Sequence, residues 1–192
     1  VLTSSNPLVG TVSSPLTISA GSSYANVAFQ TTFTAGSTII TAMAAGYKTG
    51  SATMTTVTPS GSPSKLVVYL APPILPSEGP TYYYPVIVQL QDAANNPAKA
   101  PIGGVGVSLS STNPSVGTVA SYVTISQDST YERTWFSATY TAGTTSIKAV
   151  ASGYASGSST MTTTGIIPAQ LSVYAALPKV PAEGGSYSIV VV

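Results

Sequence analysis

The chain repeats itself within its 192 residues. Residues 1–56 align without a gap onto residues 108–163, always 107 positions apart, and 31 of the 56 residue pairs are identical. A second match joins residues 66–69 to 171–174 and residues 76–79 to 181–184, at an offset of 105. A unit of about 105 residues is therefore used more than once, which is typical of an array rather than of a single catalytic domain.

The ends of the chain do not coincide with the ends of the repeat. We expect one complete domain at residues 64–164, an incomplete domain at 1–57 that lacks its first two strands, and those same two strands of a following domain at 168–192. The 19 residues equivalent to 89–107 have no counterpart between the last residue and the first. The sequence thus predicts tandem units that are cut inside a repeat, with the strands at 168–192 either donated to the next unit or continuous with it.

Charge and residue types exclude several classes of function. Only 6% of the residues are charged and the net charge is +1, so no surface can neutralise a row of phosphates and we expect no nucleic-acid partner. The chain has no His and no Cys, which removes the usual nucleophiles, proton shuttles and zinc ligands. We therefore expect no catalytic residue, no cofactor and no metal site. No apolar run is long enough to predict a membrane span.

Alternation of apolar and polar residues predicts short strands throughout the chain. It is clearest at 86–91 and 105–110, and further candidates are 65–71, 116–119, 122–126, 131–140, 144–151 and 157–163. Short strands separated by turn residues, without a helical pattern, are typical of an antiparallel β-sandwich, so the expected fold class is all-β. The expected core residues are Val86, Val88, Leu90, Val107, Leu109, Ile125, Phe136, Tyr140, Ile147 and Ala149.

Several of these segments resemble a known family. The residues at 65–69, the turn at 76–79, the strand at 86–92 and the segment 143–149 that leads to Gly153 and Tyr154 resemble the immunoglobulin-like repeats of invasin and intimin type adhesins. Similar repeats recur in tandem in archaeal surface-layer proteins and extracellular filaments. The resemblance implies tandem immunoglobulin-like sandwiches and an extracellular structural or adhesive role at the cell surface. It transfers no catalytic residue.

Few side chains outside the core could carry a specific function. Glu78 and Glu183 recur, each before a glycine, and we expect turn carboxylates there, because calcium takes six or more oxygen ligands and no other acidic residue recurs nearby. Trp135 is expected to face outward, since its counterpart is Ala28. Such a tryptophan can contact a sugar or a neighbouring domain, or have no role.

Two classes of function remain open: a structural subunit of an extracellular filament or thread, and an adhesin stalk, glycan-binding module or surface-layer component. We expect the strands at 168–192 to pair with the incomplete domain of the next copy, which makes identical subunits the main partners and glycans or other cells further ones. A window from a longer covalent array predicts the same pairing. The expected interface comprises Leu171, Val173, Tyr174, Ile189, Val190 and Val192 in the donated strands and Ile18, Phe29, Phe33 and Ile40 beneath them.

Overall fold

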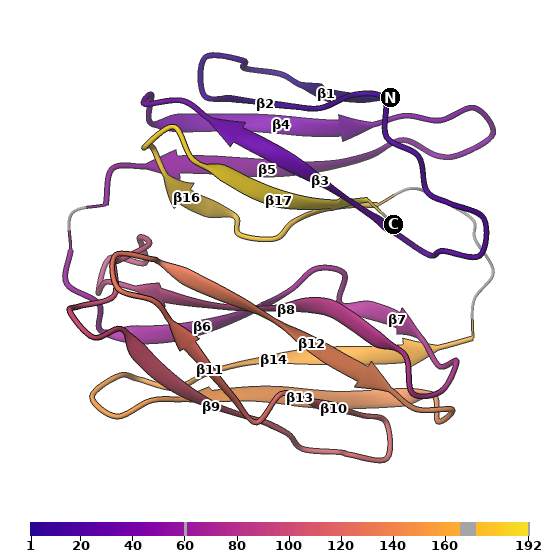
Figure 1. Ribbon diagram of the computed structural model, residues 1–192. Coiled ribbons are helices and arrows are strands. Elements are labelled where there is room, and N and C mark those ends of the chain that lie inside the picture. Colours follow the sequence, from indigo (N-terminus) through magenta and orange to yellow (C-terminus); the bar gives the residue numbers. More distant parts are fainter. Residues whose placement is uncertain (60, 166–171, 192) are drawn as a thin grey trace. The chain divides into compact units, whose positions relative to one another are not determined.

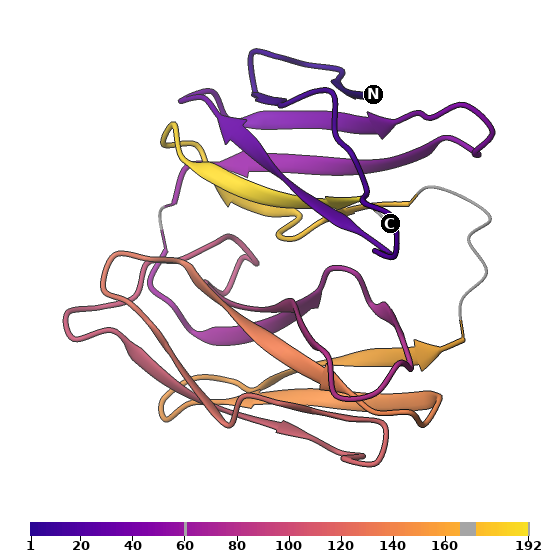
Figure 2. The ribbon, with the colours of Figure 1, turned by 45° about the vertical axis from the view of Figure 1, so that its right-hand side comes forward.

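The computed structural model describes residues 1–59, 61–165 and 172–191. They form two compact units: the first combines residues 1–59 with 172–191, and the second contains residues 61–165. Every regular element in these ranges is a β-strand, and each unit consists of two layers (Figures 1 and 2). The predicted all-β sandwich class is therefore confirmed. No helix in the described ranges is long and apolar enough to cross a membrane.

The second unit is built from nine consecutive strands. One sheet has the order β10-β12-β8-β6 and the other the order β11-β9-β13-β14-β7. The strands are β6 (Lys65–Leu70), β7 (Ile74–Pro76), β8 (Tyr82–Gln91), β9 (Val105–Ser111), β10 (Gly117–Val119), β11 (Tyr122–Ile125), β12 (Tyr131–Ala138), β13 (Gly143–Val150) and β14 (Gly157–Thr164). All neighbours are antiparallel except β7, which pairs with β14 in parallel. The alternation of apolar and polar residues does not predict this short parallel strand.

The first unit repeats this arrangement with strands from both ends of the chain. Its sheets have the orders β1-β4-β5-β16 and β15-β17-β3-β2. The strands are β1 (Leu2–Ser4), β2 (Gly10–Val12), β3 (Ala25–Thr31), β4 (Gly36–Ala42), β5 (Gly50–Val57), β15 (Val173–Ala175), β16 (Lys179–Pro181) and β17 (Ser186–Val191). In Figure 1 the yellow β16 and β17 lie beside the purple β5 and β3, although more than 100 residues separate them in sequence.

A phenylalanine stacked on a glycine anchors the core of each unit. Phe136 of β12 is 0% exposed, and a Cβ atom added to Gly117 of the neighbouring β10 would lie 2.2 Å from its Cζ. The first unit repeats the contact, since a Cβ at Gly10 would lie 2.3 Å from Cζ of the equally buried Phe29. Only glycine leaves room for the ring at this position, because close-packed interiors have no free volume for an extra carbon.

In each unit a buried threonine hydroxyl forms hydrogen bonds with a serine hydroxyl and with the backbone N–H of an asparagine. Thr145 of β13 is 2% exposed; its Oγ1 lies 2.7 Å from Oγ of Ser111 and accepts the N–H of Asn113 at 2.9 Å. The first unit repeats both hydrogen bonds with Thr38, Ser4 and Asn6. In the part of the chain that the structure describes, no buried side-chain nitrogen or oxygen lacks a partner. The hydroxyl-rich sequence is therefore compatible with a dry sandwich interior.

The expected core is found apart from one residue. All ten predicted positions are buried except Tyr140, which is 78% exposed. The prediction extended the strand to residue 140, but β12 ends at Ala138, so the alternation no longer applies. The Tyr140 ring instead covers the turn at Gly79, where an added Cβ would lie 2.4 Å from Tyr140 Cζ.

Phe136→Ala should therefore lower the free energy of unfolding of the second unit by about 3–5 kcal/mol, because it removes a fully enclosed ring and leaves a cavity. The matched variant Tyr140→Ala removes a ring that is largely in solvent and should cost less than about 1 kcal/mol. Denaturant titration followed by the fluorescence of Trp135, the single tryptophan of the chain, measures both. Equal losses would contradict the assignment of Phe136 as the anchor of this core.

Candidate assembly joint

The structural feature with a functional consequence is the joint that closes the first unit. We call β15, β16 and β17 the completion strands. β17 pairs with β3 in antiparallel fashion, from Ser186 opposite Gln30 to Val191 opposite Ala25. β15 pairs with β17, and β16 pairs with β5 in parallel. The completion strands thus extend both sheets of the sandwich.

The second unit contains the same pairings from a continuous stretch of chain. There β8 pairs with β12, β6 with β8, and β7 with β14. In sequence the completion strands follow the second unit, but they occupy in the first unit the places that β6, β7 and β8 occupy in the second. The strands expected at 168–192 and the incomplete domain expected at 1–57 lie together in one unit of the same chain.

The core of the joint forms between β17 and β3. Residues directly opposite each other in an antiparallel pair share a face, so Ile189, opposite Val27, lies on the face of β3 that carries the buried Phe29. Val191 lies on that face as well, opposite Ala25. Ile189 is 0% and Val191 3% exposed. These two are the fully buried side chains that β17 contributes to the sandwich interior; Tyr187, opposite Phe29, lies on the same face and is partly exposed.

Of the two predicted interface residues that lie on β17, Ile189 faces the sandwich interior and Val190 does not. Val190 is buried, but it lies on the other face of β17, between Tyr174 and Asn26, whereas the repeat, in which residue 192 is equivalent to Val88, makes it equivalent to the core residue Val86. The reason is a β-bulge in the second unit, where the register between β12 and β8 shifts at Pro85. Proline has no N–H for the ladder and is tolerated in a central strand only at such an irregularity. β17 has no proline and pairs with β3 without a shift.

Other predicted interface residues have mixed outcomes. Val173 lies on β15 and is buried, Tyr174 is partly exposed, and Ile40 of β4 is 0% exposed in the core. Leu171 and Val192 lie outside the described residues. The prediction for Ile18 was wrong, because it is only half-buried and belongs to no strand.

Ile18 differs from its counterpart Ile125 for a reason that the repeat makes clear. Ile125 is 0% exposed on β11 and pairs with Val105 of β9. Among the described residues, no strand pairs with the segment around Ile18, so its side chain is less covered than that of Ile125.

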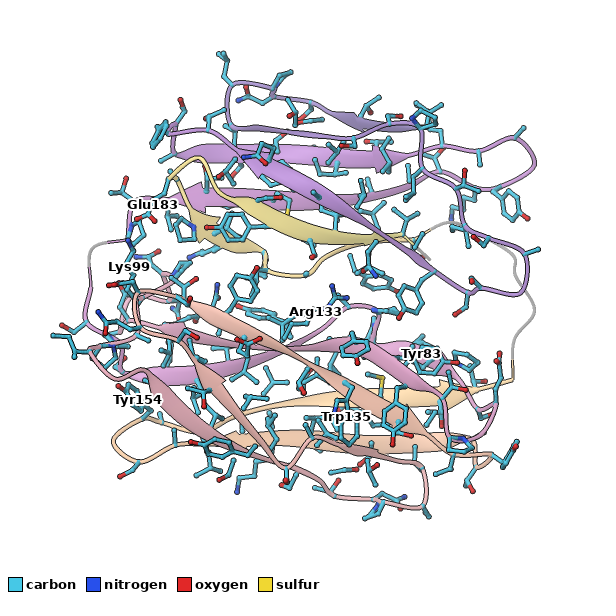
Figure 3. The ribbon with its side chains drawn as sticks, viewed as in Figure 1. Tyr83, Lys99, Arg133, Trp135, Tyr154 and Glu183 are labelled. Atoms are coloured by element: carbon cyan, nitrogen blue, oxygen red, sulfur yellow. The ribbon has the colours of Figure 1, made fainter. Side chains whose placement is uncertain are left out.

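The prediction that Phe33 is buried was also wrong. β3 ends at Thr31, and Phe33 is 83% exposed, with its ring against Gly184, where an added Cβ would lie 3.2 Å from Phe33 Cζ. Gly184 has a φ of 72°, which glycine adopts without strain. The repeated Glu-Gly pair is therefore a turn covered by an exposed aromatic ring; Figure 3 labels Glu183 at this turn.

Hydrogen bonds to backbone carbonyls tie the turn before β17 to the end of β3. Thr31 donates its N–H and its hydroxyl to the carbonyl of Gly185, each at 2.8 Å. Gln30 Nε2 donates to the carbonyl of Gly184, also at 2.8 Å. These bonds join residues that are 154 positions apart, and they fix the register of β17 independently of its apolar side chains.

A second anchor of the joint, on β16, was not among the predicted interface residues. Val180 is 0% and Leu177 1% exposed, and the carbonyl of Pro178 and the N–H of Ala182 bond to the backbone of Thr55 and Val57 on β5. At the offset of 105, Val180 matches the buried Leu75 of β7. The repeat therefore contained the signal, but short parallel strands have no distinctive alternation.

The chemistry of the described side chains is limited. Within residues 1–59, 61–165 and 172–191, no group of three or more acidic side chains is placed to hold a metal ion. Burial raises the pKa of the Tyr69 phenol, and the hydrogen bond from Gln91 Nε2 opposes that rise. Burial also raises the pKa of Tyr131. A raised phenol pKa keeps the hydroxyl neutral at physiological pH.

Comparison with known proteins gives structural similarity without a sequence family. No protein-family model matches the sequence, and no curated protein matches it. The chain is similar to a glycosyl hydrolase family 2 member from Bacteroides cellulosilyticus (14% identity, TM-score 0.47, covering 68% of this chain and 18% of that one). It is similar to invasin, described as a bacterial integrin-binding protein, with 18% identity and a TM-score of 0.40; the match covers 83% of this chain and 40% of that one. It is also similar to domains 1–6 of the surface layer protein SbsC, with 18% identity and a TM-score of 0.38; the match covers 87% of this chain and 20% of that one. The chain spans less than half of each of these proteins.

Ile189→Asp should open the first unit, because it places a carboxylate in the apolar interior, which costs at least about 3 kcal/mol for an unpaired charge. The matched variant Ser186→Asp puts the same charge on the exposed start of the same strand and should leave the fold intact. Two-dimensional NMR of backbone amides distinguishes the two: Ile189→Asp should collapse the dispersion of β3 and β5 while β8 and β12 keep theirs. Retention of both sets of resonances would contradict the assignment of Ile189 to the core of the joint.

Proposed function

We propose that the protein is a structural building block of an extracellular cell-surface filament, assembled head to tail by completion of its sandwiches. The observation that carries this proposal is that the first unit is built from two segments far apart in the chain. Its β3 and β5 are paired by strands that lie beyond an entire second unit in sequence. A unit formed in this way can be completed by its own chain or by another copy with identical contacts.

The contacts of the joint are suited to exchange between chains. They consist of ladder hydrogen bonds, which are independent of sequence, and of apolar side chains at alternate positions, which fix the register. Adding a strand of one chain to the sheet of another uses both features. When each copy donates its completion strands to the next, the contact is heterologous and does not close on itself, which gives an open fibre.

The surface chemistry supports an extracellular role. With 6% charged residues, the surface depends on hydroxyl groups for its contact with water. Both units present alternate Ser and Thr residues on the outward side of equivalent strands, Ser51, Thr53 and Thr55 on β5 and Ser158, Thr160 and Thr162 on β14. The hydration of hydroxyl groups does not depend on pH, so such a surface suits an environment whose pH is not buffered by a cell.

A continuous array of sandwiches, as in an adhesin stalk or a surface layer, would use the same joint within one long polypeptide. The two arrangements differ in the covalent mass of the native material. Donation between subunits gives separate short chains on a denaturing gel, because strand pairing between them is not covalent. An array requires a much larger chain on a denaturing gel.

Supplying the completion strands from a separate molecule tests the proposal. A chain shortened to residues 1–164 should have a folded second unit and an unfolded first unit, because β3 and β5 lose their partners. A peptide of residues 168–192 should bind this chain and restore the amide dispersion of β3 and β5. The matched control is the same peptide with Ile189→Asp, which should not bind. A first unit that stays folded without the peptide, or one that the peptide does not restore, would contradict donation between chains.

A further inference from the structure

The second unit has an exposed aromatic cluster that the fold does not require. The cluster consists of Tyr82 and Tyr84 of β8 and Trp135 of β12. Phe136 and Tyr83 face the core, so their neighbours in the strand lie on the outer face of the sheet. Tyr82 is 62% and Tyr84 53% exposed, and Trp135 is partly exposed; Figure 3 labels Trp135 on β12.

Comparison of the two units separates the requirements of the fold from this cluster. The residue of the first unit that takes the place of Tyr82 is Ser186, because it lies opposite Gln30 as Tyr82 lies opposite Ser137. Trp135 corresponds to Ala28 in the repeat. The first unit forms the same sandwich with serine and alanine at these places. The rings of the second unit are thus an addition to the scaffold, and a group of exposed and partly exposed aromatic side chains on one face indicates a binding surface.

Two rings of the cluster, Tyr82 and Trp135, are perpendicular to each other and form a corner. The ring centroids of Tyr82 and Trp135 are 5.1 Å apart and the ring planes are 86° from each other. An edge-to-face pair is favourable in itself and holds the two rings in place. Arg133 Nε donates a hydrogen bond to the carbonyl of Tyr84, which links β12 to the bulged part of β8. The rings therefore form a positioned surface rather than freely rotating side chains.

Hydroxyl groups border this corner. Ser137 lies opposite Tyr82 on one side and opposite Thr118 of β10 on the other. Directly opposite side chains on one face have Cβ atoms about 5 Å apart, so Tyr82, Ser137 and Thr118, which all carry a hydroxyl, are neighbours across three strands. Arg133 is two residues before Trp135 on the same face of β12 and is the one charged side chain of this face that the hydrogen bond to Tyr84 links to the cluster.

We propose that this surface binds a neutral carbohydrate. A sugar ring has an apolar face of C–H groups, which pack on the negative face of an aromatic ring, and equatorial hydroxyls that exchange hydrogen bonds with a row of hydroxyls. A purely apolar partner would leave the hydroxyls of Thr118 and Ser137 without hydrogen bonds, which is unfavourable. A ligand with several charges would find one charged side chain at the cluster, Arg133, and its Nε already donates a hydrogen bond to the carbonyl of Tyr84. The proposal is independent of strand donation, because it rests on the second unit alone.

The position of the tryptophan makes the test specific. Trp135 is the single tryptophan of the chain, so a saturable change in tryptophan fluorescence reports binding at this site. The probes are cellohexaose, laminarihexaose, mannohexaose and xylohexaose, titrated into the full chain to millimolar concentration. At least one of them should give a saturable change.

The variants follow from the first unit. Tyr82→Ser and Trp135→Ala introduce the residues of Ser186 and Ala28, with which the same sandwich folds, and unchanged thermal unfolding verifies that fold. Each should weaken binding by about tenfold or more, measured by fluorescence for Tyr82→Ser and by calorimetry for Trp135→Ala. The control Tyr122→Ala removes a tyrosine that is 59% exposed on the other sheet and should bind as the unmodified chain does.

Four results would overturn the proposal. The first is the absence of any fluorescence change with all four probes, and the second is an equal loss of affinity in Tyr122→Ala. The third is binding of a charged oligosaccharide, such as hexagalacturonate, in the absence of binding to the neutral ones. The fourth is a fluorescence change that depends on protein concentration without sugar, which would assign the cluster to a contact with a second copy.

Discussion

The pairing of β3 and β5 with strands from outside their own segment is the constraint on which the first unit depends. Without β17 and β16, both sheets of residues 1–59 would expose unpaired backbone groups beside Phe29, and such edges pair with whatever strand is available. β17 forms the backbone hydrogen bonds that β3 would otherwise lack, and its Ile189 and Val191 side chains lie on the face that carries Phe29. The same interaction therefore folds the unit and offers a means of joining one chain to the next.

The internal repeat made much of this predictable. It predicted the sandwich class and the burial of Phe136 and Phe29, and it indicated that the segment 168–192 carries strands of the kind that residues 1–57 lack. Two of its predictions failed, for different reasons. Phe33 and Tyr140 were assigned to the core because the alternation was extended past the ends of β3 and β12. The register of β17 could not be predicted, because it depends on a bulge at Pro85 that only one copy has.

The differences between the copies also separate scaffold from surface. The Phe-Gly contact and the buried threonine recur in both units, so they belong to the fold. Trp135 and Tyr82 occur in one unit only, on the outer face, where substitution does not disturb the core. A repeated chain can vary such a face in one copy while the other shows which residues the sandwich needs. A binding function would therefore be carried by the unrepeated surface and an assembly function by the repeated strands.

The central claim is that the completion strands pass from one chain to the next in the assembled state, and a disulfide across the joint tests it most directly. Gln30 and Ser186 lie opposite each other next to the hydrogen bond from Thr31 N–H to the Gly185 carbonyl. They are thus a non-hydrogen-bonded pair with Cα atoms about 4.5 Å apart, a distance that a disulfide spans. The chain has no other cysteine. Oxidised assemblies of the Gln30→Cys, Ser186→Cys variant should give a ladder of covalent multimers on a non-reducing denaturing gel. Assemblies that yield only internally crosslinked single chains would contradict the account.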